Sequence, residues 1–435
     1  MASDKTHITL LYLHRHRLND INNWLKSLAK VTSLQVLLVV SDSTQTNIDL
    51  LLETGHEFDI YNIQSNEAQY SIYENGPSIL ILYREIIRLS KNFTQRYKAA
   101  ANLLECYPKS VLITYDDRMS GLLPILKAAF DLNVPVFLPA ILTTSPDITA
   151  TTSNILSSKR KVESLIAYFV KWFSPNHVNS DGRMFYGAPE YLNLLRFGSL
   201  PKHPWIKGTL KYTTILGVES KLAYEKLLSQ GVNKNKMVLT GMPIFDLMEL
   251  SACKDKIDFQ EKILVCALPQ YAEHGAMSWD QAIPVLEDIF LAFKKYDGRV
   301  IISLHPRMDK SLYQPLVDKF GYECASKDLN YLLPYADVFF CASSSTTIYW
   351  SLILGIQTVV FNHTYPKSNL FKDYESLVYI ENNAIDEIES ALNKVPNFDN
   401  LINKDQKALS ADIAMNNACG SRNLEVINSL LGISS

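Results

Sequence analysis

The sequence has no pair of cysteines at the spacing of a zinc site and no excess of basic charge. Its six cysteines are scattered through 435 residues: Cys106, Cys253, Cys266, Cys324, Cys341 and Cys419. This scatter argues against a disulfide framework and a structural zinc site, and it is typical of a reducing compartment. The net charge of −3 argues against the basic surface of a nucleic-acid-binding protein, so we expect no nucleic-acid partner.

Long apolar runs are missing as well. No segment approaches the roughly 18–20 consecutive apolar residues that cross a bilayer. The first residues, MASDKTHITLLYLHRHR, contain a short apolar run that His14 and Arg15 interrupt, so we expect no signal peptide. These absences predict a cytoplasmic protein, either free or peripheral at the inner face of the membrane.

The commonest nucleotide and nucleophile motifs are absent too. A Walker A loop and a GxGxxG turn are both missing, which argues against ATP and NAD chemistry. A GxSxG segment is also missing, which argues against an α/β-hydrolase. The adjacent Asp116 and Asp117 would hold a divalent metal only with further carboxylates at suitable spacing. We therefore expect no cofactor and no metal.

Strand-like and helix-like segments alternate along most of the chain, and the strands are continuously apolar. This pattern predicts an α/β protein with parallel, doubly wound sheets. A chain of 435 residues is too long for one core, so we expect two Rossmann-like domains facing a cleft. The predicted domains are 1–250 and 251–435, with a polar linker near 251–262. Helices are predicted at 78–89, at 93–106 and within 405–431, and the last helix is expected to pack back on the first domain.

Residues near 143–208 interrupt the alternation and are predicted to form an insert in the first domain. Within it, Lys159–Phe173 begins with basic residues and continues as an aromatic, amphipathic helix. One interpretation is a helix that faces the core. The other is a surface helix that contacts an anionic membrane or a lipid-linked acceptor.

The segment Tyr331–Phe361 predicts a βαβ unit with parallel strands. A strand at 337–341 and a helix at 348–354 flank five consecutive hydroxyl residues: Ser343, Ser344, Ser345, Thr346 and Thr347. Small hydroxyl side chains cap helix N-termini, and the free N–H groups there also favour a phosphate. Five such residues are more than a cap needs, so we predict a phosphate site, with simple capping as the alternative.

Three other polar segments follow predicted strands, where doubly wound sheets bind their ligands. Asp116 and Asp117 would act as a general base or bind a sugar hydroxyl, or would only cap a helix.

The second segment, Ala267–Gly275, contains Gln270, Glu273 and His274. Glu273 or His274 would donate or accept a proton in a reaction, or would be a solvated loop residue.

In the third segment, Pro306 ends the strand after His305, and Arg307 supplies donors suited to phosphate.

The order of these segments resembles the GT-B fold of non-hydrolysing UDP-N-acetylglucosamine 2-epimerases and related glycosyltransferases. The resemblance covers most of Val111–Asn362 outside the insert, including ITYDDRMSGLLPILKAAFDLNVPVFLPA and YADVFFCASSSTTIYWSLILGIQTVVFN. The epimerases have a Ser-Gly-Gly turn followed by a helical Glu that binds the ribose. Here the turn is Ser343-Ser344-Ser345, and Tyr349 and Trp350 occupy the region of that Glu.

A second resemblance is to bacterial sialyltransferases and Kdo transferases of GT-B type, which use CMP-activated sugars. The sialyltransferases have an acidic motif with the catalytic base, then a His-Pro motif and a Ser-Ser/Thr motif that hold CMP. This chain has Asp116-Asp117, His305-Pro306 and Ser343-Ser344-Ser345 in the same order. Arg118 stands where the acidic motif would have Gly.

The resemblance implies a glycosyltransferase that moves a sugar from a nucleotide donor to a surface-polysaccharide or glycolipid acceptor. A CMP-linked ulosonic acid is favoured as donor, and a UDP-sugar is the alternative. Asp117, or else Asp116, would be the base, and Glu273 or His305 would assist the chemistry. Donor-binding residues would be Gln270, His274, His305, Pro306, Arg307, Ser343, Ser344, Ser345 and Thr346. The competing functions are a 2-epimerase and a non-catalytic nucleotide-sugar-binding protein.

Overall fold

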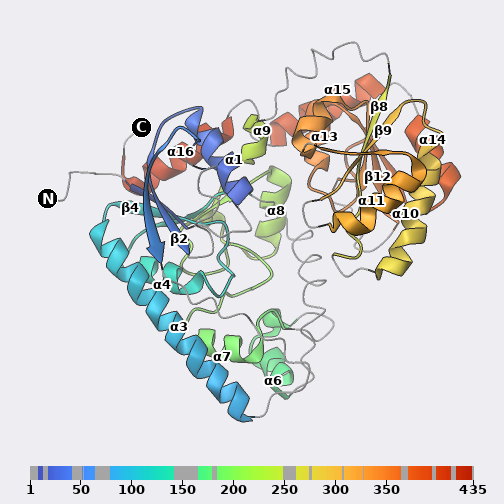
Figure 1. The fold of residues 1–435 in the computed structure, drawn as a ribbon. Helices are drawn as coiled ribbons and strands as arrows, with labels where there is room; N and C mark the ends of the chain where they lie inside the picture. The colour runs from blue at the N-terminus through green and yellow to red at the C-terminus, as the bar shows by residue number, and fades with distance from the viewer. Residues whose placement is uncertain are drawn as a thin grey trace. The chain divides into compact units, whose positions relative to one another are not determined.

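The computed structural model describes two compact units (Figure 1). The described residues are 8–12, 18–41, 51, 53–63, 79–141, 165–178, 184–247, 261–273, 277–305, 308–326, 328–363, 371–393, 398–412 and 418–433. Unit 1 contains the described residues up to Leu247 together with 418–433, and unit 2 contains the described residues of 261–412. The last segment of the chain therefore belongs to the same unit as the first.

Unit 1 is built on a parallel sheet whose seven described strands have the order β3-β2-β1-β4-β5-β6-β7. The strands are β1 (Ile8–Tyr12), β2 (Gln35–Ser41), β3 (Glu57–Ile63), β4 (Ser110–Ile113), β5 (Val136–Leu138), β6 (Ile215–Val218) and β7 (Met237–Leu239). This is the Rossmann order, in which the direction of strand addition reverses between β1 and β4.

Helices cover both faces of this sheet (Figure 1). The helices of unit 1 are α1 (Leu18–Ala29), α3 (Ile79–Cys106), α4 (Leu123–Asp131), α6 (Leu165–Phe173), α7 (Ala188–Arg196), α8 (Lys221–Ser229), α9 (Pro243–Leu247) and α16 (Ala418–Leu431), with short 3₁₀ turns η4 (Pro175–His177) and η5 (Lys234–Lys236). Of these, α6 and α7 lie away from the sheet (Figure 1). The helices α1, α9 and α16 pack together, and α3 packs with α4. Opposite placement of these two groups follows from right-handed crossovers on either side of the β1–β4 reversal.

The prediction of separate helices at 78–89 and 93–106 is wrong, because α3 is continuous over 28 residues. The residues between them, Ser90-Lys91-Asn92, contain no Gly or Pro that would break a helix. The hydroxyl of Thr94 donates to the carbonyl of Ser90 at 2.9 Å within the helix. Weak intrinsic propensity alone does not end a helix whose flanks are packed.

Unit 2 repeats the architecture of unit 1. Its six described strands have the order β10-β9-β8-β11-β12-β13, all parallel. They are β8 (Ile263–Ala267), β9 (Arg299–Ser303), β10 (Glu323–Cys324), β11 (Val338–Ala342), β12 (Gln357–Phe361) and β13 (Leu377–Ile380). The helices are α10 (Trp279–Phe293), α11 (Lys310–Phe320), α12 (Leu329–Leu332), α13 (Ile348–Leu354), α14 (Ile385–Asn393) and α15 (Phe398–Asp412), with the 3₁₀ turn η6 (Leu333–Tyr335).

Residues 405–431, predicted as one helical stretch, contain parts of two helices in different units. The first, α15, packs on α13, and the amide of Gln406 donates to the carbonyl of Ile353 at 2.9 Å. The second, α16, packs on α1, and the indole nitrogen of Trp24 donates to Asn423 Oδ1 at 3.2 Å. Two separate packing surfaces, rather than helical periodicity, determine where each helix lies.

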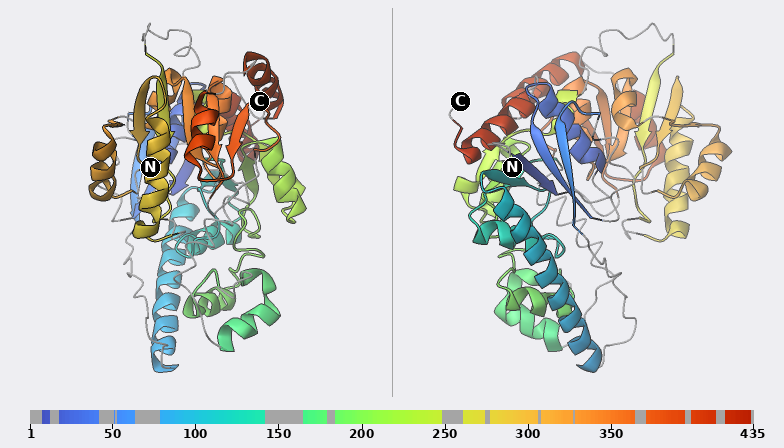
Figure 2. Two further views of the ribbon diagram at one scale, coloured as in Figure 1. Left: turned by 90° about the vertical axis from the view of Figure 1, so that its right-hand side faces the viewer. Right: turned by 60° about the vertical axis from the view of Figure 1, so that its left-hand side comes forward.

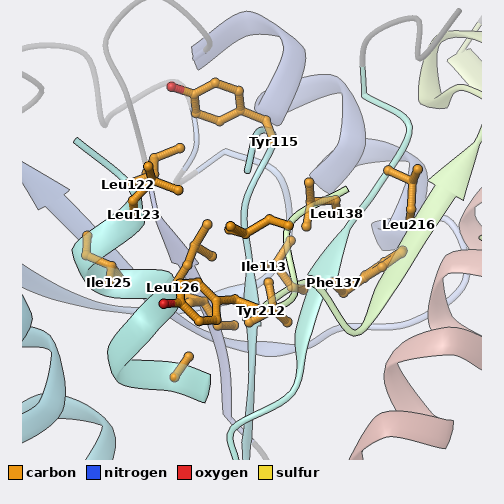
Figure 3. Packing of buried hydrophobic residues seen from close by; sticks show 14 of the residues in the cluster. Ile113, Tyr115, Leu122, Leu123, Ile125, Leu126, Phe137, Leu138, Tyr212 and Leu216 are labelled. Atoms are coloured by element: carbon orange, nitrogen blue, oxygen red, sulfur yellow. The ribbon is translucent and has the colours of Figure 1, made fainter. Parts of the chain in front are cut away.

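Each unit has its own apolar core. In unit 1, Leu123 and Leu126 of α4 belong to one buried cluster with Ile113 of β4 and Phe137 of β5 (Figure 3). Burying a side chain of this size stabilises a fold by roughly 1.5–3 kcal/mol. This packing fixes the end of β4, where the candidate site of unit 1 begins.

Candidate active site

The segment that follows β4 is buried in unit 1 and contains both predicted catalytic carboxylates. Asp117 is completely buried and joins the end of β4 to the segment before β6. Its Oδ2 accepts hydrogen bonds from the backbone nitrogen of Gly208 at 3.0 Å and from Thr213 Oγ1 at 2.8 Å. Its Oδ1 is buried without a hydrogen-bond partner among the described residues. Only one of the two carboxylate oxygens of Asp117 is therefore hydrogen-bonded to the described residues.

Asp116 has a different environment because Arg118 binds both of its oxygens. The guanidinium donates from Nη2 to Oδ2 at 2.7 Å and from Nε to Oδ1 at 3.0 Å. The backbone nitrogen of Arg118 also donates to Oδ1 at 2.7 Å. The remaining guanidinium nitrogen, Nη1, donates to the carbonyl of Trp205 at 3.0 Å. Arg118, which departs from the Gly of the acidic motif, thus pairs with the first carboxylate.

The two environments move the two pKa values in opposite directions. Burial, and then the charge of Asp116, raise the pKa of Asp117 from 3.8 to about 6. Burial alone would raise the pKa of Asp116, but the charge and hydrogen bonds of Arg118, with the charge of Lys207, lower it to about 2. A carboxyl group that titrates near neutral pH can give or take a proton during a reaction. Asp117 has this property and Asp116 does not.

In unit 2 the predicted donor residues follow strands at the reversal point of the sheet. The register pairs Ala267 of β8 with Cys341 of β11 and with Ser303 of β9, so these strands end at one edge. Gln270 follows β8, His305 follows β9, and the hydroxyl run follows β11. The structure therefore brings these three predicted segments to the same edge of one unit, where doubly wound folds bind ligands.

The hydroxyl run forms a turn before α13. Ser343 is buried, and its backbone nitrogen donates to the carbonyl of Phe361 at 3.0 Å. Ser345 Oγ lies 2.6 Å from Thr347 Oγ1 and accepts from the backbone nitrogen of Thr347 at 3.3 Å. Thr347 is the residue before the helix, and its side chain makes no capping hydrogen bond. Within this turn, the hydroxyl of Ser345 therefore bonds to the residue that precedes α13.

Gln270 and Glu273 lie in the segment after β8. The side-chain oxygen of Gln270 is buried and has no hydrogen-bond partner among the described residues. Both carboxylate oxygens of Glu273 accept from the hydroxyl of Tyr313, on α11, at 2.9 Å. Burial, and then the charge and hydrogen bond of Glu273, raise the pKa of Tyr313, so the phenol stays a donor to this carboxylate.

His305 is exposed at the end of β9, and its carbonyl accepts from the backbone nitrogen of Met308 at 2.8 Å. Three predicted site residues lie outside the described residues: His274, Pro306 and Arg307. Of the two aromatic residues in the position of the epimerase Glu, Tyr349 is buried against the ring of Phe371, with centroids 4.8 Å apart. The indole nitrogen of Trp350 is buried and has no partner among the described residues.

Sequence reasoning missed a polar cluster at the ends of β12 and β13. The amide of Asn362 donates to both oxygens of Glu381, at 3.0 and 3.1 Å. Lys372 forms an ion pair with the same carboxylate at 3.2 Å. Nδ1 of His363 lies 3.1 Å from the carbonyl oxygen of Glu381. The sequence feature that could have indicated this cluster is the Asn362-His363 pair directly after the apolar strand β12. Because β13 was not predicted, Glu381 was not recognised as a neighbour of this pair.

The described residues contain neither a group of three or more His, Cys, Asp or Glu side chains placed to hold a metal ion nor a helix that is long and apolar enough to cross a membrane. No protein-family model matches the sequence, and no curated protein matches it either.

Solved structures match the chain over nearly its whole length. The UDP-GlcNAc 2-epimerase of Methanocaldococcus jannaschii, in complex with UDP-GlcNAc and UDP, is similar with a TM-score of 0.52 and 14% identity, covering 97% of this chain and 99% of that chain. The glycotransferase of kitacinnamycin has a TM-score of 0.56 and 15% identity, with 98% and 99% covered. The calicheamicin glycosyltransferase CalG4 has a TM-score of 0.55 and 12% identity, with 99% of each chain covered.

At these identities the similarity shows the fold alone. The chain has an α/β GT-B fold with two Rossmann-like domains, which confirms the fold class predicted from the sequence. The similar structures include both glycosyltransferases and 2-epimerases.

Proposed function

We propose that this protein is a glycosyltransferase that moves a sugar from a nucleotide-activated donor to a glycan or glycolipid acceptor. The observation that carries the proposal is the edge of unit 2, where Gln270, His305 and the Ser343–Thr347 turn follow three neighbouring strands. The amide oxygen of Gln270, which is buried without a hydrogen-bond partner among the described residues, suits a donor group on the ligand. A ligand for this edge would need phosphate oxygens that accept from the hydroxyls of the turn and from His305. It would also need a hydrogen-bond donor for the amide oxygen of Gln270. A nucleotide-sugar has both.

The donor-side roles follow from this chemistry. His305 and the hydroxyls of Ser343, Ser344 and Ser345 would hold the phosphate, with Thr346 beside them and Arg307 assisting. Hydrogen-bond donors aimed at the leaving phosphate lower the barrier because they stabilise the charge that develops on it. Gln270, His274 and Pro306 would contact the remaining parts of the donor. The proposal needs no metal and no cofactor.

Asp117 is the better candidate for the base that accepts the acceptor's proton. Its Oδ1 has no partner among the described residues, and its pKa of about 6 lies close to the working range of a general base. Asp116 is bound on both oxygens by Arg118, and its pKa of about 2 makes it a weak proton acceptor. Glu273 would have a secondary role in acid–base chemistry or in binding the donor sugar.

For the donor we favour a CMP-linked ulosonic acid, with a UDP-sugar as the alternative. The His305-Pro306 and Ser343–Ser345 segments support CMP because of their similarity to the CMP-binding motifs. The alternative has its own support, because the similar epimerase structure contains UDP-GlcNAc and UDP. A thermal-shift panel of CMP, CDP, UDP, GDP and TDP decides between them, since a nucleotide that binds only the folded state raises the melting temperature.

A 2-epimerase is the competing enzyme. Tyr349 and Trp350 argue against it, because neither supplies a carboxylate and Tyr349 is packed against Phe371. Incubation with UDP-GlcNAc and no acceptor separates the two functions. Formation of a C2 epimer, or of free UDP plus sugar, would rule out the transferase.

Variants test the assignment of the donor site. His305→Ala and Ser344→Ala should each raise the apparent Kd for the preferred nucleotide about tenfold. The thermal shift at a given nucleotide concentration should therefore be smaller in both variants. Ser229→Ala, an exposed serine at the end of α8, is the matched control and should change nothing. If nucleotide binds but no donor is consumed with any acceptor, the protein is a binding protein and the catalytic part of the proposal fails.

A further inference from the structure

Helix α6 presents a cluster of four exposed aromatic side chains. Tyr168, Phe169, Trp172 and Phe173 are 78%, 60%, 74% and 60% exposed. The rings of Phe169 and Trp172 each lie 4.6 Å from that of Phe173, centroid to centroid. Large rings in contact with each other and with water form an apolar patch, which monomeric proteins avoid unless it binds something.

The opposite face of α6 holds the helix on unit 1. Val170 is buried, and just after the helix Ser174 Oγ accepts from the hydroxyl of Tyr191 at 2.9 Å. The ring of His177 packs edge-on against Tyr191, with centroids 5.4 Å apart, and its Nε2 lies 2.9 Å from the carbonyl of Pro201. The exposed aromatic residues are therefore not needed to attach the helix, and they are presented on a fixed support.

The charge that α6 itself contributes is positive. No acidic residue lies in α6, and the exposed Lys171 stands between Phe169 and Trp172 in the sequence. In the sequence, Lys159, Arg160 and Lys161 precede the helix, and the single acid of that stretch is Glu163. An apolar helix surface that carries a lysine and no acid fits a negatively charged partner.

The beginning of α3 adds to the same end of unit 1. All three views place α6 and the N-terminal end of α3 at that end (Figures 1 and 2). Tyr83 and Ile87, one helical turn apart on α3, are exposed apolar side chains. Arg84 and Lys91 are exposed on the same part of the helix. This end of the unit therefore offers aromatic and aliphatic side chains together with cations.

We propose that α6 docks unit 1 on an anionic lipid bilayer, with Phe169, Trp172 and Phe173 entering the interface and Lys171 contacting the headgroups. Tyr and Trp rings are favoured at the boundary between headgroups and acyl chains. A helix of nine residues cannot cross a bilayer, so it lies on the surface. The inference goes beyond the proposed function and does not depend on it, because lipid binding needs neither donor nor acceptor.

Co-sedimentation of the full chain with vesicles tests the proposal. Vesicles of equal parts phosphatidylglycerol and phosphatidylcholine should bind the protein, and pure phosphatidylcholine should bind it much more weakly. The double variant Phe169→Ser/Trp172→Ser should lose at least about tenfold in affinity. Tyr331→Ser, which removes an aromatic side chain that is also 60% exposed but lies in unit 2, is the matched control and should bind as the original protein does.

A second readout does not depend on a large substitution. Trp172 is far more exposed than Trp24 and Trp205, which are buried. Vesicles with bromine-labelled acyl chains should therefore quench part of the tryptophan fluorescence, and Trp172→Phe should remove that quenching. Lys171→Glu should weaken binding to the anionic vesicles only. Absence of binding to anionic vesicles would overturn the proposal. If the protein then forms a dimer that the double variant dissociates, the aromatic cluster is instead an interface between two copies of the chain.

Discussion

Asp246 of α9 accepts a hydrogen bond from the backbone nitrogen of Gly420 through Oδ2 at 2.7 Å, across 174 residues of sequence. Its other oxygen accepts from the nitrogen of Cys419 at 3.2 Å. The hydroxyl of Ser27 on α1 also donates to Oδ2, at 2.7 Å. One buried carboxylate thus binds the first turn of α16, where N–H groups lack partners within the helix and favour negative charge.

Replacing Asp246 should therefore loosen the C-terminal helix. Asp246→Ala leaves buried donors on Ser27, Cys419 and Gly420 unsatisfied, and we expect a loss of about 2–4 kcal/mol in unfolding free energy. Urea denaturation measures the loss, and hydrogen exchange should show that the amides of α16 lose protection first. Ser429→Ala, at an exposed site on the same helix, should change stability by less than about 0.5 kcal/mol. Equal stability of the two variants would contradict this role of Asp246.

Gly420 allows the close approach of α16 to α1. A Cβ atom at this position would lie 2.3 Å from the carbonyl oxygen of Ser27, which no real contact permits. Because that oxygen belongs to the backbone of a packed helix, Gly420→Ala should shift α16 and cost about 1–3 kcal/mol. Thermal unfolding checks this prediction. A melting temperature equal to that of the original protein would mean that α16 adapts without loss.

Sequence reasoning found much of the fold because buried parallel strands are readable as short apolar runs. The strands β4, β8, β9, β11 and β12 all have this character. It missed β3 because Glu57 and Asp59 interrupt the apolar pattern of an edge strand. It also missed β10, which has two residues, and β13. Strands at the margins of a sheet are defined by pairing with a neighbour, and one sequence does not show pairing.

The candidate site was predictable in position but not in detail. That polar residues follow β4, β8, β9 and β11 is visible in the sequence, and the parallel topology gathers the unit 2 residues at one edge. Which oxygen of Asp117 is bonded depends on Gly208 and Thr213, more than 90 residues away in the chain. Long-range contacts of this kind are why the different environments of Asp116 and Asp117 could not be inferred from their adjacency.

Arg118 should be needed to keep Asp116 buried. Arg118→Met leaves a buried carboxylate without its partner, and we expect a loss of about 3–5 kcal/mol. The double variant Asp116→Asn/Arg118→Met should lose less than the single one, because it buries no unpaired charge. Arg299→Met breaks an ion pair with Glu323 that is nearly half exposed and should cost less than about 1 kcal/mol. Urea titrations of the original protein and the three variants give the unfolding free energies. A double variant that is less stable than Arg118→Met would contradict this role of Arg118.

The stability of unit 1 should fall as Asp117 ionises. The pKa of this carboxyl is raised from 3.8 to about 6 in the folded state, so the folded protein holds a proton that the unfolded chain has released. Its contribution is fully present below about pH 4 and is lost as the pH rises to about 6, for a total of about 3 kcal/mol. Asp117→Asn cannot ionise, so the loss between pH 4 and 7 should be smaller in the variant by that amount. Identical pH dependence in both proteins would place the pKa of Asp117 elsewhere.

The same ionisation should have the opposite effect on transfer activity. A general base works only when it is deprotonated, so kcat/KM should rise with pH through about 6, the value to which burial raises the pKa of Asp117. Asp117→Asn should lower kcat by about 10²–10⁴-fold while leaving the nucleotide-induced thermal shift unchanged, because the proposed nucleotide site is in unit 2 and Asp117 is in unit 1. A carboxylate that only tied β4 to Gly208 and Thr213 would predict another result. In that case Asp117→Asn would keep the acidic limb of the profile, and activity would fall only as far as the folded fraction falls.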